Sequence, residues 1–544
     1  MAENSNGLNG SNVDNASYTN PFTNVTYKRG ELEVKVNSEE LVGKRAQEIV
    51  ARQKKVIPST TKPDYPAIMD PTHIALGPFI SSLGDNLYFD AVLNVGTSAV
   101  FGYNHPNIFP KLQKIGTCLA GYIGAGTDFF FDLRNGAPTP PDLAEAMTAL
   151  AGEAYGGEYM MNFSNAGTEA NENSLKVAMF RKFRQIKKQL SDELYRSMCE
   201  QLGIYMVRED QDNLWSNYPF FVVAFSGAFH GRTSTSNTIS MSKSRQKEGY
   251  QSVPYVVHAP YDSSVDFDKI IDWTPLETLI KENRLKAVIE SHKAPADLVA
   301  CLIVEPVQGE GGHLIPDAEF LQKLSDFVGK MRPKGMCFVS DEVQTGLYRT
   351  GEFTGMQNWF KNYPNLRPDI MSFAKPLHVG GSLIDKKLLE DWPSGKFSGT
   401  WAEGNLLGIA MACFTLDQLK EIDPVLGRPY SEHCKESGKY LRGLIEQLGT
   451  RLESQMPGTK LILNTRGLGQ MNAFDVPDHD FQTEIQNEAF LQGLHILGTG
   501  DRSIRIFGTV DQRKREAEIL VKILGNVIEK IATKTGSKSK LQSA

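Results

Sequence analysis

The chain has 544 residues, which is long for one domain, so two or more structural units are expected. Hydrophobic residues make up 40% and charged residues 22%, as in ordinary globular proteins, and a net charge of −6 gives no indication of a nucleic acid or an anionic membrane as a partner. The six cysteines form no CxxC pair and no cluster with histidine, and no apolar stretch has the length of a membrane span, so the sequence predicts no disulfide framework, no metal site and no membrane segment.

The two ends of the chain differ in composition from the rest. The chain begins MAENSNGLNGSNVDNASYTN, which is rich in Asn, Ser and Gly and contains neither the apolar core of a signal peptide nor an arginine. We therefore expect a disordered leader at 1–25 and a disordered tail at 533–544, where the chain ends TKTGSKSKLQSA. Because no targeting segment is recognised, the expected compartment is the cytoplasm.

Predicted strands and helices alternate between about residues 135 and 385. Strand–helix–strand units of this kind predict an α/β fold with a mainly parallel sheet covered by helices. One amphipathic helix is indicated by DAEFLQKLSDFVGK, whose apolar residues recur at helical spacing. Short, nearly continuous apolar runs typical of strands buried on both faces are PFFVVAF (219–225), VACLIVEPV (299–307), MCFVSD (336–341) and DIMSF (369–373).

The remaining segments indicate the domain boundaries. Charged, helix-like stretches at about 185–217 and 266–298 are predicted to be insertions, and from about residue 400 helical stretches indicate a second, α+β unit. We expect the N-terminal segment of a small domain at 26–95, a large domain at 96–390 and the C-terminal part of the small domain at 391–532.

Two stretches follow predicted strands and carry groups that could bind a phosphorylated, flat ligand. In FSNAGTEANENSLKVAMF the amides at a helix N-terminus, with Gly167 and Thr168, suit a phosphate, although a capped helix after a turn is the alternative. In SGAFHGRT, Phe229 or His230 could stack on a flat ring and Arg232 could bind a carboxylate. Taken singly, such residues are more often a core aromatic and a surface charge.

Acidic side chains follow two further strands. EPVQGEGG carries Glu305 and Glu310, and SDEVQTG carries Asp341 and Gln344. An acid directly after an apolar strand is expected to be half-buried and to need a cationic or hydrogen-bonding partner. Capping or a solvated loop is the alternative interpretation of each stretch.

Lys375 lies in SFAKPLHVGG, between an apolar run and a glycine pair. A surface lysine is one interpretation. In an apolar pocket, however, desolvation lowers the pKa of a lysine and frees its amine to form a Schiff base. A lysine, an acid and a phosphate cradle at successive strand ends are the parts that pyridoxal phosphate requires.

This set of motifs resembles the class III (subgroup II) aminotransferases, which use pyridoxal phosphate on a type I fold. The resemblance extends from DNLYFDAVLNVGTSAVFGYNHP (85–106) to GTGDRSIRIF (498–507). Within the class, FDLRNGAPTPPDLAEAM, FSGTWAEGN and GDRSIRI are most similar to the 4-aminobutyrate and lysine 6-aminotransferase branch. The resemblance implies a large cofactor-binding domain and smaller N- and C-terminal α+β parts.

The resemblance also implies the roles of the residues that hold the cofactor. Lys375 would form the Schiff base and shuttle a proton, and Asp341 would pair with the pyridinium nitrogen. The other implied contacts are Phe229 on the ring face, Gln344 near the phenolic oxygen, Gly167 and Thr168 at the phosphate, and Thr400 at the phosphate of a neighbouring subunit. A homodimer with shared active sites is therefore expected.

Substrate contacts follow from the same resemblance. Arg232 matches the arginine that binds the distal carboxylate of 4-aminobutyrate or the α-carboxylate of lysine, and Arg505 matches the one that binds the α-carboxylate of glutamate and 2-oxoglutarate. Glu310 matches the carboxylate that covers the second arginine when the donor has no carboxylate there. Glu305 would support the substrate side and the ring.

Three functions remain open from the sequence. The first is transfer of the terminal amino group of an ω-amino acid, such as 4-aminobutyrate or lysine, to a 2-oxo acid by a ping-pong mechanism. The second is racemisation or epimerisation of an amino acid, and the third is a non-catalytic scaffold. The chain departs from the family pattern in RIFGTV, which follows the second arginine, and in AKPLHVGG around the lysine.

Overall fold

The computed structural model describes residues 17–37, 43–56, 68–96, 100–119, 138–203, 220–243, 247–250, 255–393, 396–397, 405–423 and 427–542. The chain divides into two compact units. The first comprises residues 1–120, 347–352 and 413–544, and the second comprises residues 121–346 and 353–412. Each unit buries hydrophobic clusters of its own. The domain boundaries predicted from the sequence stay a prediction.

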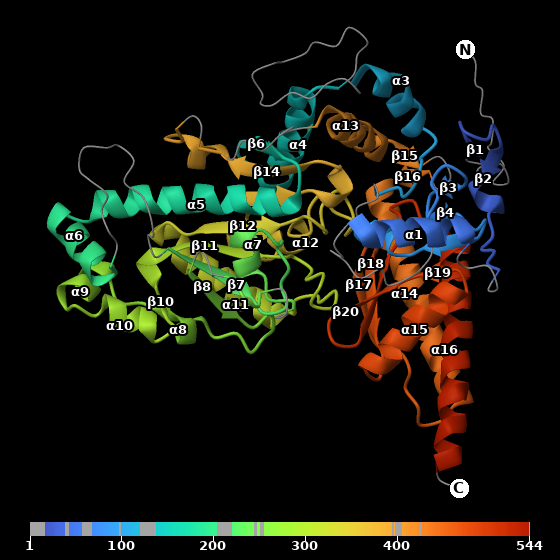
Figure 1. Ribbon diagram of the computed structural model, residues 1–544. Helices are drawn as coiled ribbons and strands as arrows, with labels where there is room; N and C mark the ends of the chain where they lie inside the picture. Colours follow the sequence, from blue (N-terminus) through green and yellow to red (C-terminus); the bar gives the residue numbers. More distant parts are fainter. Residues whose placement is uncertain are drawn as a thin grey trace, which may run out of the picture. The chain divides into compact units, whose positions relative to one another are not determined.

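The second unit is built around a seven-stranded sheet (Figure 1). One strand, β14, is antiparallel to both of its neighbours, and the other neighbouring pairs are parallel. The predicted α/β fold with a mainly parallel sheet is therefore confirmed, and the four predicted strands correspond to β7, β11, β12 and β13. In spatial order the strands are β6 (Tyr159–Ser164), β14 (Gly380–Asp385), β13 (Ile370–Phe373), β12 (Cys337–Asp341), β11 (Val299–Val304), β7 (Phe221–Phe225) and β8 (Tyr255–Ala259).

Alternate residues of each strand point to opposite faces of this sheet. Both faces are apolar because helices cover both of them. On β7, Val222 and Ala224 pack with residues of α5 (Gly167–Gln189), whereas Phe221, Val223 and Phe225 pack with residues of α11 (Ala318–Met331). Figure 1 shows these two helices on opposite sides of the sheet. The continuous apolar run that predicted a strand buried on both faces is explained by this layering.

Shorter elements complete the second unit. The predicted insertion at 266–298 forms three short helices and two short strands, and residues 204–217 of the other predicted insertion lie outside the described residues. The helices are α4 (Pro140–Tyr155), α6 (Asp192–Gln201), α7 (Ser234–Ile239), α8 (Phe267–Ile270), α9 (Leu276–Lys281), α10 (Leu285–Glu290) and α12 (Gln357–Phe360), and the strands are β9 (Ile271–Asp272) and β10 (Ala294–Pro295).

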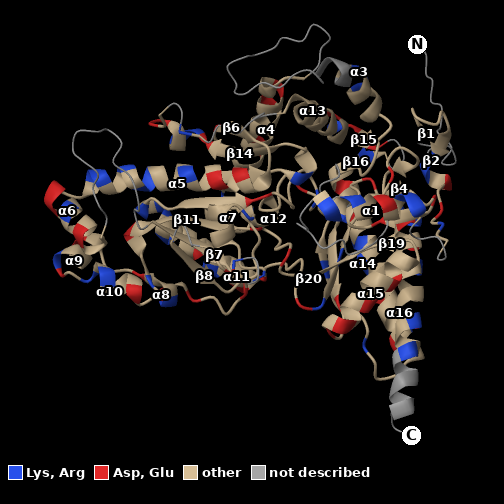
Figure 2. Ribbon diagram, in the orientation of Figure 1, with Lys and Arg blue, Asp and Glu red and all other residues tan. Residues whose placement is uncertain are grey.

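Charged residues are distributed over the outer helices of this unit. Figure 2 shows acidic and basic residues interspersed along α6, α9 and α10. Several form ion pairs one helical turn apart, such as Lys281 with Glu277 and Lys286 with Glu290. None of the helices in the described part of the chain is long and apolar enough to cross a membrane.

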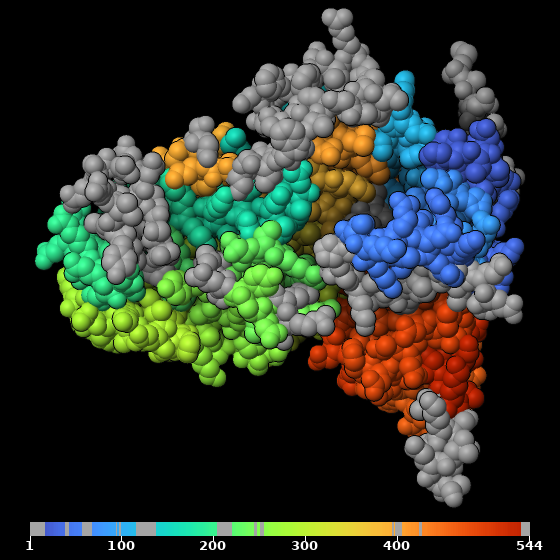
Figure 3. All heavy atoms as spheres, viewed as in Figure 1, coloured from blue at the N-terminus to red at the C-terminus, as the bar shows by residue number. Residues whose placement is uncertain are grey.

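The first unit combines two four-stranded sheets with long helices. Helix α1 lies on its surface (Figure 3), and α13 (Leu406–Lys420) begins in the second unit and ends in the first. One sheet has the order β17 (Leu463–Leu468), β18 (Met471–Asp475), β21 (Ser503–Phe507) and β20 (Leu497–Thr499), and the other has β19 (Leu494–His495), β5 (Leu87–Asp90), β4 (Phe79–Ser81) and β3 (Ala75–Leu76). The helices are α1 (Lys44–Val56), α2 (Leu93–Gly96), α3 (Phe109–Leu119), α14 (Tyr430–Gln455), α15 (His479–Leu491) and α16 (Lys514–Gln542).

Part of each predicted disordered end has a defined structure. Residues 1–16 lie outside the described residues, but β1 (Ser17–Thr19) pairs with β2 (Thr26–Lys28) and so begins within the predicted leader. At the other end, α16 continues into the predicted tail, as far as Gln542. A two-residue strand pair, β15 (Ile422–Asp423) with β16 (Arg428–Pro429), completes the elements of this unit.

Arg29 connects the start of the first unit to its C-terminal part. Its guanidinium donates to Asp511 at 2.6 Å and to both oxygens of Glu516 at 2.6 and 2.9 Å, and all three side chains are buried. Burial opposes ionisation of Asp511, but Arg29 and Arg513 hold the pKa of this carboxyl well below its usual range. Gly77, with φ +57°, leaves room for the arginine, since a Cβ atom there would lie 2.6 Å from its Nε.

Replacing Arg29 by methionine should destabilise the protein by about 3–5 kcal/mol, because Asp511 and Glu516 would remain buried without the guanidinium that donates to both of them. The neighbouring Lys28 pairs with Glu31 at an exposed position, so Lys28→Met is the matched control and should cost at most about 1 kcal/mol. Urea denaturation of both variants measures the difference. Equal losses would show that the buried cluster contributes no more than an exposed pair.

Candidate active site

A pocket of about 270 Å³ opens at the edge of the seven-stranded sheet where the parallel strands end. Its wall comes from the segments that follow β6, β7, β11, β12 and β13 in the sequence. The predicted site residues that line it are Gly167, Thr168, Phe229, Arg232, Glu305, Asp341, Gln344 and Lys375, and the others are Asn171, His230, Gly231, Val343 and Ala374. The pocket therefore brings together residues that are far apart in the sequence and that follow successive strands.

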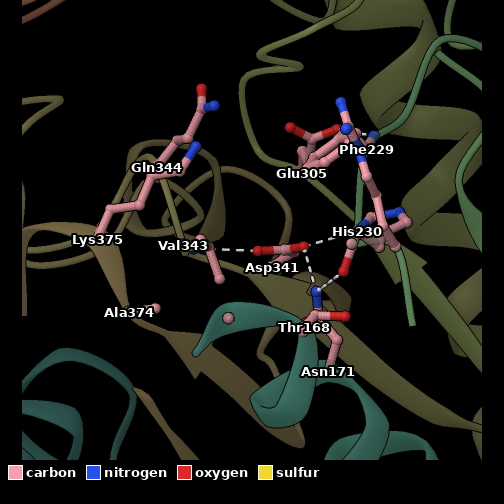
Figure 4. Close-up of a pocket in the computed structure, with 13 residues that line it drawn as sticks. Thr168, Asn171, Phe229, His230, Glu305, Asp341, Val343, Gln344, Ala374 and Lys375 are labelled. Carbon is pink, nitrogen blue, oxygen red and sulfur yellow. Dashed lines mark hydrogen bonds and ion pairs between the residues drawn. The ribbon is translucent and has the colours of Figure 1, made fainter. Parts of the chain in front are cut away.

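Asp341 lies at the centre of a hydrogen-bond network (Figure 4). Its Oδ1 accepts from the backbone N–H of Val343 at 3.0 Å, and its Oδ2 accepts from Asn171 Nδ2 at 2.8 Å. The Nδ1 atom of His230 lies 2.8 Å from the same Oδ2. Asp341 is only 3% exposed. The predicted partner of a pyridinium nitrogen is thus a buried carboxylate that three surrounding groups contact.

Sequence analysis missed Asn171. Its amide group donates both to Asp341 and, at 2.8 Å, to the backbone carbonyl of His230, so it joins α5 to β12 and to the segment after β7. The signal was present in the spacing, because Asn171 follows Gly167 by four residues and therefore lies on the same face of the helix. His230 was considered only for ring stacking, whereas its Nδ1 contacts Asp341.

The start of α5 has the form of a phosphate cradle. Gly167 begins the helix, and a Cβ atom there would lie 2.8 Å from a methyl group of Val343, so only glycine fits without a shift. The hydroxyl groups of Thr168 and Thr233 lie 2.8 Å apart at the same end. Gly231 has φ +130°, and a Cβ atom on it would lie 2.2 Å from Thr168 Oγ1. Backbone amides and hydroxyls collected in this way suit a bound phosphate.

Lys375 begins a short 3-10 turn, Lys375–Leu377, directly after β13, and its side chain is half-buried at the pocket. Among the described residues, three buried pocket atoms have no hydrogen-bond partner: Oε1 of Gln344, Oδ1 of Asn171 and Nε2 of His230. Buried polar atoms are normally paired. Together with the glycine cradle and the buried Asp341, these atoms fit a polar, phosphorylated ring, as predicted for pyridoxal phosphate.

Glu305 fixes two segments of the pocket wall. Its Oε1 accepts from the backbone N–H of Phe229 at 2.9 Å, and its Oε2 accepts from that of Gly309 at 3.0 Å. Burial raises the pKa of Glu305 to about 7. The charge of His230 and the two backbone N–H groups oppose this shift, and the charge of Asp341 adds to it.

Arg232 is exposed at the pocket, and its guanidinium carbon lies 5.7 Å from the ring centre of Phe229. A planar cation in this position can receive a carboxylate while its own face rests near an aromatic ring. This arrangement suits the predicted binding of a donor carboxylate.

The other three predicted residues are not among those that line this pocket. Glu310 follows Gly309 on the glycine-rich segment after β11 and lies 3.9 Å from Lys243. Arg505 is buried on β21 in the first unit. Thr400 lies outside the described residues. The assigned roles of the site residues, including these three, stay predictions. Within the described ranges there is also no group of three or more His, Cys, Asp or Glu that could hold a metal ion.

The chain is similar to known proteins along most of its length. The family model described as aminotransferase class-III matches residues 63–528. A probable mitochondrial 4-aminobutyrate aminotransferase of Caenorhabditis elegans is 25% identical over 464 residues, covering 84% of this chain and 86% of the relative. An alanine/serine racemase of Pyrococcus horikoshii is 24% identical over 511 residues, covering 90% and 92%. The fold is similar to that of a lysine aminotransferase from M. tuberculosis, with a TM-score of 0.65 at 19% identity, covering 89% of this chain and 98% of that one.

The raised pKa of Glu305 predicts a pH-dependent stability. Between its ordinary pKa of about 4.3 and its folded value of about 7, the folded protein holds a proton that the unfolded chain releases. The stabilisation that this proton provides is complete below the ordinary pKa and is lost as the pH rises through about 7. Glu305→Gln carries no such proton, so from about pH 5 to about pH 8 the variant should gain stability relative to the unmodified protein.

The measurement is the urea midpoint of the cofactor-free proteins at both pH values. Glu158→Gln is the control, because Lys386 lowers the pKa of the exposed Glu158, so its titration lies below this range. A difference between Glu305→Gln and the unmodified protein that does not change with pH would contradict the assigned pKa.

Proposed function

Because the chain belongs to the class III aminotransferases, which depend on pyridoxal 5′-phosphate, we propose that it moves the terminal amino group of an ω-amino acid to a 2-oxo acid such as 2-oxoglutarate. 4-Aminobutyrate, lysine or a related metabolite is the proposed donor. The observation that carries this proposal is the convergence of Lys375, the buried Asp341 and the cradle at Gly167 in one pocket. The names of relatives such as the 4-aminobutyrate aminotransferases support the donor class.

The pocket residues have distinct proposed tasks toward the cofactor. Gly167 and Thr168 hold the phosphate, Phe229 lies against the ring, Asp341 binds the pyridine N–H and Gln344 lies near the phenolic oxygen. When bound, the cofactor supplies an electron-accepting ring joined to the substrate nitrogen. Gln344 would make its contact with the phenolic oxygen through its side-chain NH₂ group, because its Oε1 can only accept a hydrogen bond.

Lys375 has two proposed tasks. Its amine would hold the cofactor covalently before the substrate arrives, and it would then remove a proton from the substrate carbon that bears the amino group. In the donor half of the cycle the same amine passes this proton on to the second carbon of the transfer. In the acceptor half the proton moves in the reverse direction. Its side chain is half-buried just after β13 and lines the pocket.

Two arginines and one carboxylate are proposed to let one site serve two substrates. Arg232 binds the donor carboxylate, and Arg505 binds the α-carboxylate of the 2-oxo acid. Glu310 pairs with Arg505 when the donor has no carboxylate for it, which avoids an unpaired charge in a dry site. Thr400 is proposed to reach the phosphate of a second subunit, so the working enzyme is a homodimer.

Racemisation of an α-amino acid is the second candidate. The specific observation in its favour is the similarity to an alanine/serine racemase over 90% of this chain. The two reactions share removal of a proton from the substrate and differ in which carbon receives it afterwards. They also differ in whether the amino group leaves.

The proposal predicts a half-reaction. Mixing the purified holoenzyme with 4-aminobutyrate or lysine, without a 2-oxo acid, should bleach the visible absorbance of the bound cofactor, because the amino group is transferred to it. Lys375→Ala should still bind cofactor but lose at least about 100-fold in the rate of bleaching, since it lacks the base. Lys386→Ala, at an exposed position, is the control.

Either of two results would contradict parts of this scheme. Persistent absorbance with every ω-amino acid, while the optical rotation of an α-amino acid decays, would favour the racemase. Appreciable turnover by Lys375→Ala would remove that lysine from its assigned task.

Arg232→Ala should raise the KM for the donor by about tenfold to 150-fold with a smaller change in kcat. The physical reason is the loss of a charge-assisted, two-pronged contact worth roughly 1.5–3 kcal/mol. Arg232→Lys keeps the charge but not the paired geometry. Its KM for the donor should therefore lie between those of the unmodified enzyme and Arg232→Ala. Initial rates at a saturating acceptor concentration measure the effect. An unchanged donor KM would mean that the carboxylate binds elsewhere.

A further inference from the structure

Three side chains of the second unit form a hydrogen-bond chain that leads away from the phosphate cradle. The hydroxyl of Thr168, at the start of α5, lies 2.8 Å from that of Thr233, and the hydroxyl of Thr233 donates to Oε1 of Glu172 at 2.5 Å. Thr168 lines the pocket (Figure 4), whereas Thr233 and Glu172 are not among its lining residues. The chain therefore begins at the pocket and ends at a carboxylate one turn further along α5.

The direction of the hydrogen bonds in this chain follows from the number of hydrogens available. A carboxylate only accepts, so the single hydroxyl hydrogen of Thr233 is used at Glu172. The oxygen of Thr233 then accepts, and Thr168 is the donor in the contact between the two threonines. In this arrangement the hydroxyl hydrogen of Thr168 points to Thr233 and not into the pocket.

A phosphate group in the cradle competes for the same hydrogen. Its oxygens carry negative charge and are strong acceptors, so the hydroxyl of Thr168 can bond to it only as the donor. Thr168 has one hydroxyl hydrogen and cannot direct it to the phosphate and to Thr233 at the same time. Binding of the phosphate therefore breaks the bond between the two threonines, and the oxygen of Thr233 loses its donor.

We propose that Glu172, acting through Thr233, weakens the hold of the cradle on the phosphate of the cofactor. This inference rests on the proposed function, in which Gly167 and Thr168 bind that phosphate. Glu172 and Thr233 are positioning residues, because neither lines the pocket. In the donor half of the cycle the amine of Lys375 no longer holds the cofactor, so the contacts with the phosphate determine how readily the cofactor dissociates and is exchanged.

Replacing Glu172 by glutamine reverses the chain. The side-chain NH₂ group of glutamine can donate to the oxygen of Thr233, the hydroxyl of Thr233 then donates to that of Thr168, and the hydrogen of Thr168 is left for the phosphate. Glu172→Gln should therefore bind a phosphate ester about two- to tenfold more tightly, the range of one hydrogen bond. Thr233→Val removes the acceptor of the Thr168 hydrogen and should also tighten binding, whereas Thr233→Ser keeps the chain and should not.

Glu169 provides the matched control for charge. It lies in the first turn of α5, and its Oε2 accepts from the backbone N–H of Asn165 at 2.7 Å. Glu169→Gln removes one negative charge from the same end of the helix, retains an acceptor for Asn165 and leaves the three-residue chain in place. The excess of the Glu172→Gln effect over that of Glu169→Gln measures the contribution of the chain.

The experiment measures, by calorimetry, the Kd of pyridoxamine 5′-phosphate for full-length variants from which the cofactor has been removed. This form of the cofactor makes no covalent bond with Lys375, so its affinity depends on the non-covalent contacts alone. Pyridoxamine, which lacks the phosphate, and inorganic phosphate are titrated in parallel. Thr168→Ala tests the phosphate contact itself.

The expected result is specific to the phosphate. Glu172→Gln and Thr233→Val lower the Kd of pyridoxamine 5′-phosphate and of inorganic phosphate about two- to tenfold and leave that of pyridoxamine unchanged, while Thr233→Ser and Glu169→Gln have smaller effects. An unchanged Kd in Glu172→Gln, or an equal gain in Glu169→Gln, would overturn the role of the chain, as would unchanged phosphate binding in Thr168→Ala. Failure of the proposed function is distinguishable, because a holoenzyme that accepts no ω-amino acid contradicts it whatever these Kd values are.

Discussion

The buried carboxylate of Asp341, at the end of β12, receives hydrogen bonds from three different parts of the second unit. Val343 donates from the turn that follows the strand, Asn171 donates from α5, and the ring of His230 approaches from the segment after β7. A buried charge with fewer donors would be costly, so these segments are constrained to meet at this edge of the sheet. The amino end of α5, one turn before Asn171, is thereby held beside the same carboxylate, and the phosphate cradle depends on that placement.

The sequence was sufficient to predict the framework around this carboxylate because the framework rests on repeated, local signals. Continuous apolar runs predicted β7, β11, β12 and β13, since alternate residues of each face different helices and both faces must be apolar. The polar residues directly after those runs predicted the pocket, since the carboxyl ends of parallel strands share one edge. Asp341 and Lys375 were found by this reasoning, and the structure places both at the pocket.

Residues whose importance depends on tertiary contacts were harder to predict. Asn171 is a polar residue in a helix, and only the packing of α5 on the sheet reveals that its amide joins Asp341 to the backbone of His230. The sequence could not distinguish a substrate-binding role of Glu305 from a structural one. In the structure its two oxygens accept from backbone N–H groups of two different loops and so connect these loops. Glu310 was predicted as a switch from a resemblance, but its contact with Lys243 joins separate loops and had no signal in the sequence.

Among the residues proposed for substrate binding, Arg232 is exposed, whereas Arg505 is buried, as Asp341 is. Asp341 and Gln344 are buried among fixed donors and tight glycine contacts, and any change there alters several elements together. Arg232 is exposed, and its side chain can be replaced without disturbing the sheet. A site built in this way keeps its reaction while its substrate preference changes through exposed charges on loops.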